Sequence, residues 1–283
     1  AGLAAMTPIS RRGGVPILRP LLGMSPDLLI EHCATCDAGF ESDPSNLDRR
    51  YERVRVRGAL AAMADHGSAM SDHLLRLARA AGTIDRALLR ALAGSGYLPA
   101  IQPSGHMLLP SGVAGLPTSI AARLLAHVIG QVARPQAPPA TRALHHLAMR
   151  LADGRAATLG GVRFSFHDGD WLVTAEIGRR PPRLRVRGGE QAIFAGIWEI
   201  ASPVDATIRH LGEAGSGAAG DWTKTPGWCA LPSLVRRSMP VLETLDGAMI
   251  YPHLQINDID AATTLHATAR FLPMSPAAAA YRH

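Results

Sequence analysis

Apolar residues recur every three or four positions through most of residues 58–153, which is the spacing of one face of an α-helix. The stretch "SAMSDHLLRLARAAG" has this pattern, and Gly82 is expected to end the helix. "TIDRALLRALAG" repeats the pattern directly afterwards, with Thr83 as the expected N-cap. The sequence therefore predicts two consecutive helices here, separated at Gly82.

Three other segments have the features of helices. Two of them are "TSIAARLLAHVIGQVA" and "TRALHHLAMRLADG", the latter with Thr141 as its cap and Gly154 as its end. Near the start of the chain, Ser25 precedes Pro26, which is the usual order of an N-cap and a first helical residue. This order predicts a helix that runs to about Ala38.

From about residue 155 the period changes to two, as expected for strands. "VRFSFHDGDWLVTAEI" alternates on both sides of Asp168-Gly169 and predicts a β-hairpin, with the aspartate as a turn former. "RLRVR" and "AIFAGIWEI" predict further strands, "GEAGSGAAGDWTKTPGW" a loop and "LPSLVRRSMPVLE" a short helix. Trp171 and Trp198 fall on strand patterns and are expected in the core rather than stacked on bases.

These elements predict a multidomain α+β protein. A chain of 283 residues, 47% of them hydrophobic, is long enough for two or three domains. We expect a first domain at residues 1–57, an all-helical middle domain at 58–153 and a mixed α/β, mainly β domain at 154–283. No apolar run is long enough to span a bilayer, so no membrane partner is expected.

The charge balance indicates an anionic partner only weakly. The net charge is +6, but Lys224 is the only lysine, and abundant arginine, alanine and glycine are typical of a biased coding composition. Local clusters of arginine are therefore more informative than the total.

Cysteine and histidine do not predict a metal site. Cys33 and Cys36 form a single C-x-x-C without the second pair that a structural zinc site needs. His145 and His146 are adjacent on a predicted helix, where neighbours point about 100° apart. Three cysteines in a chain of this size also argue against a disulfide framework and favour a reducing cytoplasm.

The stretch "ESDPSNLDRRYERVRVR" at residues 41–57 is the strongest candidate site. Asp43, Pro44, Ser45 and Asn46 form a turn sequence, and five arginines follow within nine positions, 49–57. As a strand, this segment would place Arg53, Arg55 and Arg57 on one face; as a helix, it would align Arg50, Arg53 and Arg57 instead. Arginine's planar fork suits phosphate oxygens, but a solvated face with Asp48 and Glu52 as ion partners is also consistent.

The same stretch, with "ILRPLL" about twenty residues before it, resembles a pair of motifs of the tRNA(Ile)-lysidine synthases. The opening "AGLAAM" is similar to the segment that precedes the first motif in that family, and "TLGGVRF" and "LPSLVRRSMPVL" are similar to later parts of its alphaproteobacterial branch. The residues that carry the two specific motifs are Arg19, Pro20, Leu21, Leu22, Asp43, Pro44, Ser45, Asn46, Asp48, Tyr51, Arg53, Arg55 and Arg57.

The resemblance implies an ATP-dependent ligation in the cytoplasm. In that family the wobble cytidine of a CAU-anticodon tRNA(Ile) is adenylated, and lysine then displaces AMP. The implied cofactor is ATP with Mg²⁺, and the implied partners are tRNA(Ile) and lysine. Residues 1–57 would be the C-terminal end of the adenylating domain, with Arg53, Arg55 and Arg57 on phosphate or tRNA, and Asp43, Ser45 and Asn46 holding the turn that aims them. Arg19 is expected to be structural.

One departure from the family limits this expectation. The pyrophosphate loop S-G-G-x-D-S and the segment H-x-x-D-D-x-x-E-T are absent from the sequence, so we expect ATP to be bound mainly by a missing N-terminal segment. No catalytic residue is assigned here, and this chain alone is expected to be inactive without that segment or a second copy. A non-catalytic RNA-binding relative, split or decayed, is the alternative, and a protein whose arginines only solvate it is the third.

Overall fold

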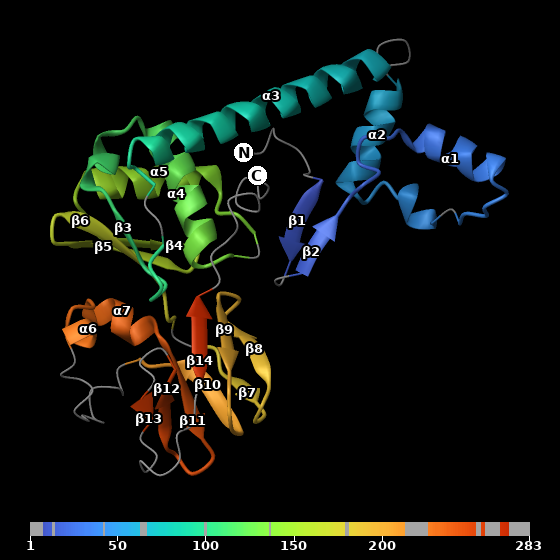
Figure 1. Ribbon diagram of the computed structural model, residues 1–283. Coiled ribbons are helices and arrows are strands. Elements are labelled where there is room, and N and C mark those ends of the chain that lie inside the picture. The colour runs from blue at the N-terminus through green and yellow to red at the C-terminus, as the bar shows by residue number, and fades with distance from the viewer. Residues whose placement is uncertain are drawn as a thin grey trace. The chain divides into compact units, whose positions relative to one another are not determined.

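The computed structural model describes residues 8–12, 15–41, 43–62, 67–98, 101–135, 137–178, 181–212, 226–252, 256–257 and 267–271. Contacts divide the chain into two compact units, one consisting mainly of residues 15–87 and the other mainly of residues 88–279. Both units mix helices with antiparallel sheets, as predicted for an α+β protein (Figure 1). The three-domain division predicted above stays a prediction.

The first unit contains a two-stranded sheet and three helices. The sheet pairs β1 (Ile9–Arg12) with β2 (Val15–Leu18). Helix α1 (Pro26–Thr35) begins as predicted, because the Ser25 side chain accepts a hydrogen bond from the backbone N–H of Leu28 at 3.3 Å. It ends three residues before the predicted Ala38, and Asp37 has a positive φ of 51°. A 3₁₀ turn η2 (Pro44–Asn46) and helix α2 (Glu52–Ala62) follow.

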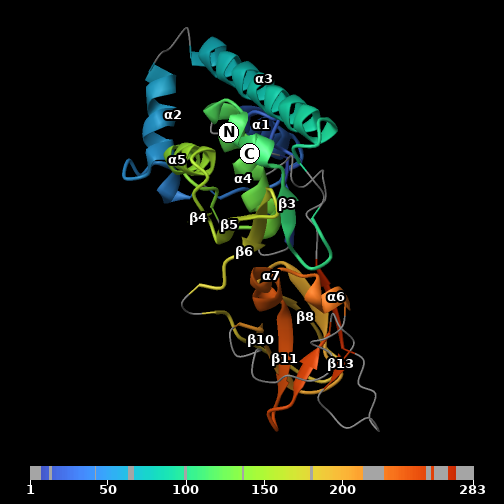
Figure 2. The ribbon, with the colours of Figure 1, turned by 90° about the vertical axis from the view of Figure 1, so that its left-hand side faces the viewer.

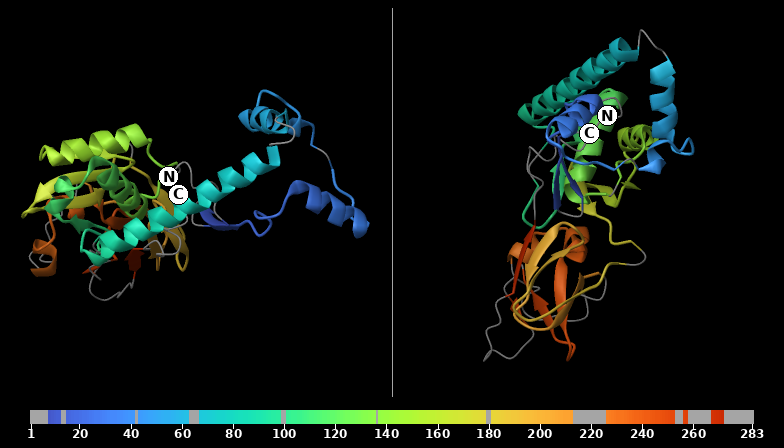
Figure 3. Two further views of the ribbon diagram at one scale, coloured as in Figure 1. Left: turned by 90° about the horizontal axis from the view of Figure 1, so that it is seen from above. Right: turned by 90° about the vertical axis from the view of Figure 1, so that its right-hand side faces the viewer.

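Helix α3 (Gly67–Gly94) corrects the prediction of two helices. It is one uninterrupted helix of 28 residues, seen end to end in Figure 1 and Figure 3. Gly82 does not end it, and Thr83 does not cap a new one. Instead the Thr83 hydroxyl donates to the carbonyl of Arg79 at 3.0 Å, as a threonine inside a helix can do. A single glycine reduces helix stability without stopping the hydrogen-bond ladder.

The second unit begins with a four-stranded antiparallel sheet and two helices that pack on it (Figure 1 and Figure 2). The strand order is β3-β6-β5-β4, with β3 at Met107–Leu109, β4 at Ala157–Leu159, β5 at Val162–His167 and β6 at Asp170–Ala175. The short turn η4 (Ser111–Gly115) leads to the predicted helices α4 (Thr118–Val132) and α5 (Thr141–Ala152). Ala140, not Thr141, stands at the cap position of α5.

The predicted hairpin is confirmed, and its surroundings explain its stability. Asp168 and Gly169 have φ angles of 48° and 91°, as a two-residue hairpin turn requires. Trp171 is 1% exposed and lies in a core formed by both helices and the sheet, so the core joins residues on both sides of position 153. Gly160 lies in the turn between β4 and β5 with a positive φ of 61°, and a Cβ there would lie 2.8 Å from Ile129 Cγ2, so a larger residue would clash with that side chain.

The rest of the second unit is mainly β. A five-stranded sheet has the order β13-β12-β11-β10-β7, and a three-stranded sheet has the order β14-β9-β8. The strands are β7 (Leu184–Val186), β8 (Gln191–Phe194), β9 (Trp198–Ala201), β10 (Ala206–His210), β11 (Pro240–Thr244), β12 (Met249–Tyr251), β13 (Ile256–Asn257) and β14 (Thr268–Phe271). Helices α6 (Pro226–Cys229) and α7 (Ser233–Ser238) complete it, and α7 confirms the predicted short helix.

Two details refine the sequence predictions in this part. "AIFAGIWEI" forms two strands rather than one, because Ala195 and Gly196 have φ angles of 52° and 72° and form a hairpin turn. Trp198 is 2% exposed, as expected for a core residue. The predicted loop in "GEAGSGAAGDWTKTPGW" lies largely outside the described residues. No helix among the described residues is both long and apolar enough to cross a membrane.

Candidate phosphate-binding site

The turn at Asp43 has the structure that its sequence predicts. The Asp43 side chain accepts a hydrogen bond from the backbone N–H of Ser45 at 2.8 Å, and the Asn46 N–H donates to the Asp43 carbonyl at 2.9 Å. Hydrogen bonds from the Ser45 backbone and side chain hold the pKa of Asp43 below its usual range, and the charge of Arg53 lowers it further. The turn is therefore most stable with an ionised aspartate, which suits a position just ahead of a cationic segment.

A second aspartate connects this turn to helix α2. The Asp48 carboxylate accepts from the backbone N–H of Arg50 at 2.9 Å and forms an ion pair with the Arg50 guanidinium at 2.7 Å. These contacts lower the pKa of Asp48 and raise that of Arg50. The Tyr51 N–H donates to the Asp48 carbonyl at 3.1 Å, and α2 begins at the next residue. Arg50 is thus occupied by Asp48, as the solvated-face interpretation expected for one of the arginines.

The structure resolves the choice between strand and helix for the arginine segment. Residues 52–62 are helical, so the strand alternative for Arg53, Arg55 and Arg57 is wrong. In a helix, residues four apart share a face, whereas residues two apart point about 200° apart. Arg53 and Arg57 therefore lie on one face of α2, and Arg55 lies on another.

The three arginines also differ in what they contact. The Arg55 guanidinium donates through Nη1 to the carbonyls of Arg49 and Arg50, both at 3.0 Å, and so ties the start of α2 to the preceding turn. The Arg53 guanidinium lies 5.0 Å from the centre of the Tyr51 ring. Arg57 forms no ion pair or hydrogen bond with any residue that the structure describes. Arg53 and Arg57 are exposed, so their donors can meet an anion from solvent.

Helix α2 does not strengthen this site through its dipole. Glu52 is its first residue, and a carboxylate there occupies the electropositive end of the helix. An anion at this site would therefore depend on the guanidinium groups of Arg53 and Arg57 rather than on backbone N–H groups.

Several large apolar side chains in the unit that carries the candidate site are exposed. Neither α1 nor α2 contains a single buried residue. Leu28 is 54% exposed, Phe40 60% and Leu47 80%, although all three belong to the first unit. Exposed apolar surface of this extent is typical of a face that packs against another protein surface.

The C-x-x-C segment shows no metal geometry in the described residues. Cys33 and Cys36 lie near the C-terminus of α1, and the Cys36 Sγ lies 3.7 Å from His32 Nε2. Across the described part of the chain, no three His, Cys, Asp or Glu side chains converge in a way that could hold a metal ion.

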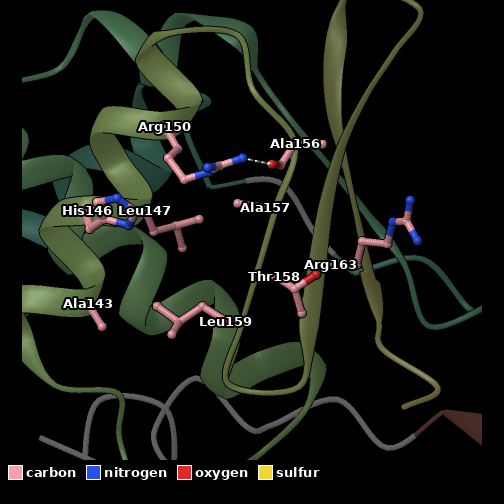
Figure 4. A pocket seen from close by; sticks show the side chains of 9 residues that line it. All are labelled: Ala143, His146, Leu147, Arg150, Ala156, Ala157, Thr158, Leu159 and Arg163. Carbon is pink, nitrogen blue, oxygen red and sulfur yellow. Dashed lines mark hydrogen bonds between the residues drawn. The ribbon is translucent and has the colours of Figure 1, made fainter. Parts of the chain in front are cut away.

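A cavity of about 590 Å³ lies between α5 and the hairpin β4–β5. The Arg150 guanidinium donates to the carbonyl of Ala156 at 2.8 Å, and Figure 4 shows it crossing above the apolar Leu147. His146 lines the cavity from the same helix, whereas the guanidinium of Arg163 points away from α5. The only sequence signal was the spacing of His146 and Arg150, four residues apart.

Comparison with known proteins identifies first the class of the segment that carries the candidate site. Residues 1–64 match a family model described as a PP-loop domain. The match covers Asp43, the turn and the arginines of α2, so this part of the chain is similar to an ATP-binding domain of the PP-loop class.

Curated proteins of one family are similar to most of the chain. The tRNA(Ile)-lysidine synthase of Ruegeria pomeroyi is 32% identical over 230 residues, which are 80% of this chain and 54% of the relative. The synthase of Methylobacterium nodulans is 32% identical over 197 residues, 65% of this chain and 56% of the relative. A third, from Novosphingobium aromaticivorans, is 34% identical over 178 residues, 60% of this chain and 50% of the relative. This chain is therefore similar to the tRNA(Ile)-lysidine synthases over most of its length, and it spans about half the length of the curated relatives it matches.

Proposed function

We propose that this chain is part of a tRNA(Ile)-lysidine synthase, which joins lysine to the wobble cytidine of a CAU-anticodon tRNA(Ile) with ATP. The observation that carries the proposal is the similarity to named synthases over 80% of the chain. The reaction would proceed through an adenylated base, from which lysine displaces AMP. This chain would complete the active site and bind tRNA.

In this proposal α2 contributes phosphate-binding groups. Arg53 and Arg57 would contact phosphate of ATP or of tRNA, because they are exposed and share one face of the helix. Arg55 would fix the start of α2 through the carbonyls of Arg49 and Arg50 and could present its remaining N–H groups to the same anion. Asp43, Ser45 and Asn46 would hold the turn that sets the direction of the helix. ATP supplies the adenylate group, and it would be bound with Mg²⁺ mainly by a PP-loop segment outside this sequence.

The proposal assigns roles to the three predicted domains. Residues 1–57 would be the end of the adenylating domain, residues 58–153 a helical middle domain, and residues 154–283 a domain that recognises tRNA outside the anticodon. The exposed apolar residues of the first unit, among them Leu28 and Phe40, would pack against the remainder of the PP-loop domain or against a second copy.

The test is an activity assay of the native polypeptide, isolated from its source with an antibody against this chain. Its intact mass is measured, and labelled lysine is followed into unmodified tRNA(Ile). We expect a mass above 29.9 kDa and an incorporation that requires ATP and the CAU anticodon. A tRNA with a different anticodon serves as the control. Lysine incorporation that does not require ATP or the CAU anticodon would contradict the proposal.

A second candidate function is tRNA binding without catalysis. It would rest on the same exposed arginines, Arg53 and Arg57, which can bind tRNA phosphate without an adenylation step. The same experiment separates the two functions. A native mass near 29.9 kDa with tRNA binding, but without lysine incorporation, would support the binding protein and exclude a self-sufficient synthase.

A further inference from the structure

A second arginine segment, "RLRVR" at residues 183–187, forms a row on the surface of the second unit. Side chains alternate between the two faces of a strand, so Arg183, Arg185 and Arg187 share one face at β7. We call these three residues the β7 arginine row. Leu184 and Val186 share the other face, and Val186 is 5% exposed in the hydrophobic core.

The register of the sheet determines which way the row faces. Leu184 lies opposite Ile208 of β10, and Val186 lies opposite Ala206, all four on the core side. Arg185 lies opposite Thr207, on the side away from that core. Strand β7 is the last strand of its sheet, so within the described residues its outer backbone groups pair with no further strand. The row therefore lies along an open edge of the sheet.

The charges of the row are not neutralised by the described residues. All three arginines are exposed, and no described residue forms an ion pair or a hydrogen bond with their guanidinium groups. Other arginines of this unit are paired: Arg209 with Glu243 at 2.8 Å and Arg270 with Glu199 at 2.5 Å.

Three carboxylates near the row accept hydrogen bonds from backbone N–H groups or from another arginine. Glu190 accepts from the backbone N–H of Arg187 at 3.1 Å, and Asp205 accepts from that of Gly188 at 2.8 Å. Glu243, which lies opposite Thr207, is held by Arg209. None of these three carboxylates forms an ion pair with a guanidinium group of the row.

The spacing of the row suits a polyanion. Alternate residues of a strand lie about 7 Å apart, which is close to the Debye length of about 8 Å at physiological ionic strength. The fields of neighbouring guanidinium groups therefore add, and a ligand with regularly spaced charges gains more from the row than a single phosphate does. Backbone N–H groups at the open edge can donate further hydrogen bonds to such a ligand.

We propose that the β7 arginine row binds the sugar–phosphate backbone of tRNA outside the anticodon. This inference deepens the proposed function and rests on it. Guanidinium groups bind phosphate oxygens through two N–H donors, and edge N–H and carbonyl groups can reach ribose 2′-hydroxyls. The apolar residues of β7 are turned into the core, so this strand offers no apolar side chain to insert into a lipid surface. Phosphate contacts carry no base information, so the row adds affinity and orientation rather than sequence preference.

The test measures tRNA affinity at several salt concentrations with the full chain and three variants. The variant R183Q/R185Q/R187Q removes the charges but keeps polar side chains of similar length, and R183K/R185K/R187K keeps the charges. The control R90Q/R142Q/R155Q removes three exposed arginines from other elements. Circular dichroism shows whether each variant is folded.

We expect the glutamine variant of the row to bind tRNA more weakly and with a shallower salt dependence. Each lost phosphate contact reduces the slope of log K against log salt by about 0.7 to 0.9, so three contacts reduce it by about 2 to 3. Between 50 and 200 mM salt, each contact accounts for roughly a threefold change in affinity. The lysine variant should keep most of the slope, and the loss should be equal for tRNA(Ile) and for an unrelated tRNA.

The remaining outcomes separate the row from the proposed function. If the row and control variants reduce the slope equally, tRNA binding depends only on the net charge of the chain. The row is then not a specific site, but the proposed tRNA binding is not contradicted. If the unrelated tRNA keeps its affinity when tRNA(Ile) loses it, the row reads sequence, and the backbone proposal is wrong. If the unsubstituted chain does not bind tRNA even at 50 mM salt, both the proposal for the row and the proposed tRNA-binding role of the chain are wrong.

Discussion

Arg53, Arg55 and Arg57 differ in their surroundings although the sequence around them is almost repetitive. The guanidinium of Arg55 is engaged by two carbonyls, and that of Arg53 lies against Tyr51. The sequence identified the segment as a candidate site, but it could not separate a structural arginine from a ligand-binding one. That distinction depends on which backbone carbonyls and aromatic rings lie close to each guanidinium group. The residue at which helix α2 begins determines these neighbours.

At this scale we predict that R53A/R57A weakens tRNA binding without unfolding the chain. If both arginines contact tRNA, the slope of log K against log salt should decrease by about 1 to 2, since each contact contributes slightly less than one unit. Filter binding at several salt concentrations measures the slope. The variant R90A/R155A removes two exposed arginines elsewhere and should leave the slope nearly unchanged. An unchanged slope in R53A/R57A would remove both residues from the RNA interface and leave ATP as their only proposed partner.

Two R-x-R-x-R segments of this chain fold into different elements. "RVRVR" at 53–57 lies in helix α2, whereas "RLRVR" at 183–187 forms strand β7 and its flanking residues. Alternation alone is compatible with both structures. The first segment follows a turn capped by Asp48 and continues into "GALAA", which extends a helix; the second follows two prolines and precedes Gly188-Gly189. The flanking residues, not the arginines, select the element.

The sequence predicted elements well where local signals agreed and failed where they conflicted. The Ser25 cap and the Asp168-Gly169 turn are local devices, and both were confirmed. Gly82 and Thr83 have the residue types of a helix end and of an N-cap. The apolar pattern nevertheless continues with the same helical period on both sides of them, so one long helix forms. The cavity beside Arg150 could not be predicted, because it depends on how α5 packs against the hairpin β4–β5 that follows it in the sequence.

The continuity of α3 predicts the effect of T83A on stability. An alanine in place of an N-cap threonine costs about 1 kcal/mol, whereas inside a helix it is neutral or stabilising by roughly 0.5 kcal/mol. Because Thr83 lies inside α3, we expect no loss of stability in urea unfolding followed by circular dichroism. The matched variant S25A removes a real cap, that of α1, and should destabilise its helix. A loss of about 1 kcal/mol in T83A would indicate a helix start at this position.

For the whole molecule, the two units differ in how completely they bury their apolar side chains. The second unit contains nearly all of the buried core, whereas α1 and α2 contain no buried residue. A single unit that exposes this much apolar surface gains free energy when another surface covers it, at about 25 cal/mol per Å². This difference supports the proposal that the first unit belongs to a larger PP-loop domain.

We therefore predict that the chain of residues 1–283 self-associates, and that L28S/F40S reduces this association. Both side chains are more than half exposed, so serine should remove apolar contact area without loss of internal packing. Sedimentation velocity over a range of concentrations measures the effect. Leu245, 89% exposed in the second unit, provides the control L245S, which should leave association unchanged. A monomer at every concentration, with or without the substitutions, would contradict this prediction.

The register in which β7 pairs with β10 determines whether all three arginines of the row face solvent or none of them does. A shift of the register by one residue would turn Arg183, Arg185 and Arg187 toward the core and expose Leu184 and Val186. Insertions in the connection between the two strands are harmless only if they leave the pairing in place. The position of a single pair of opposite residues, such as Arg185 and Thr207, thus determines whether this edge of the protein is a cationic surface or an apolar one.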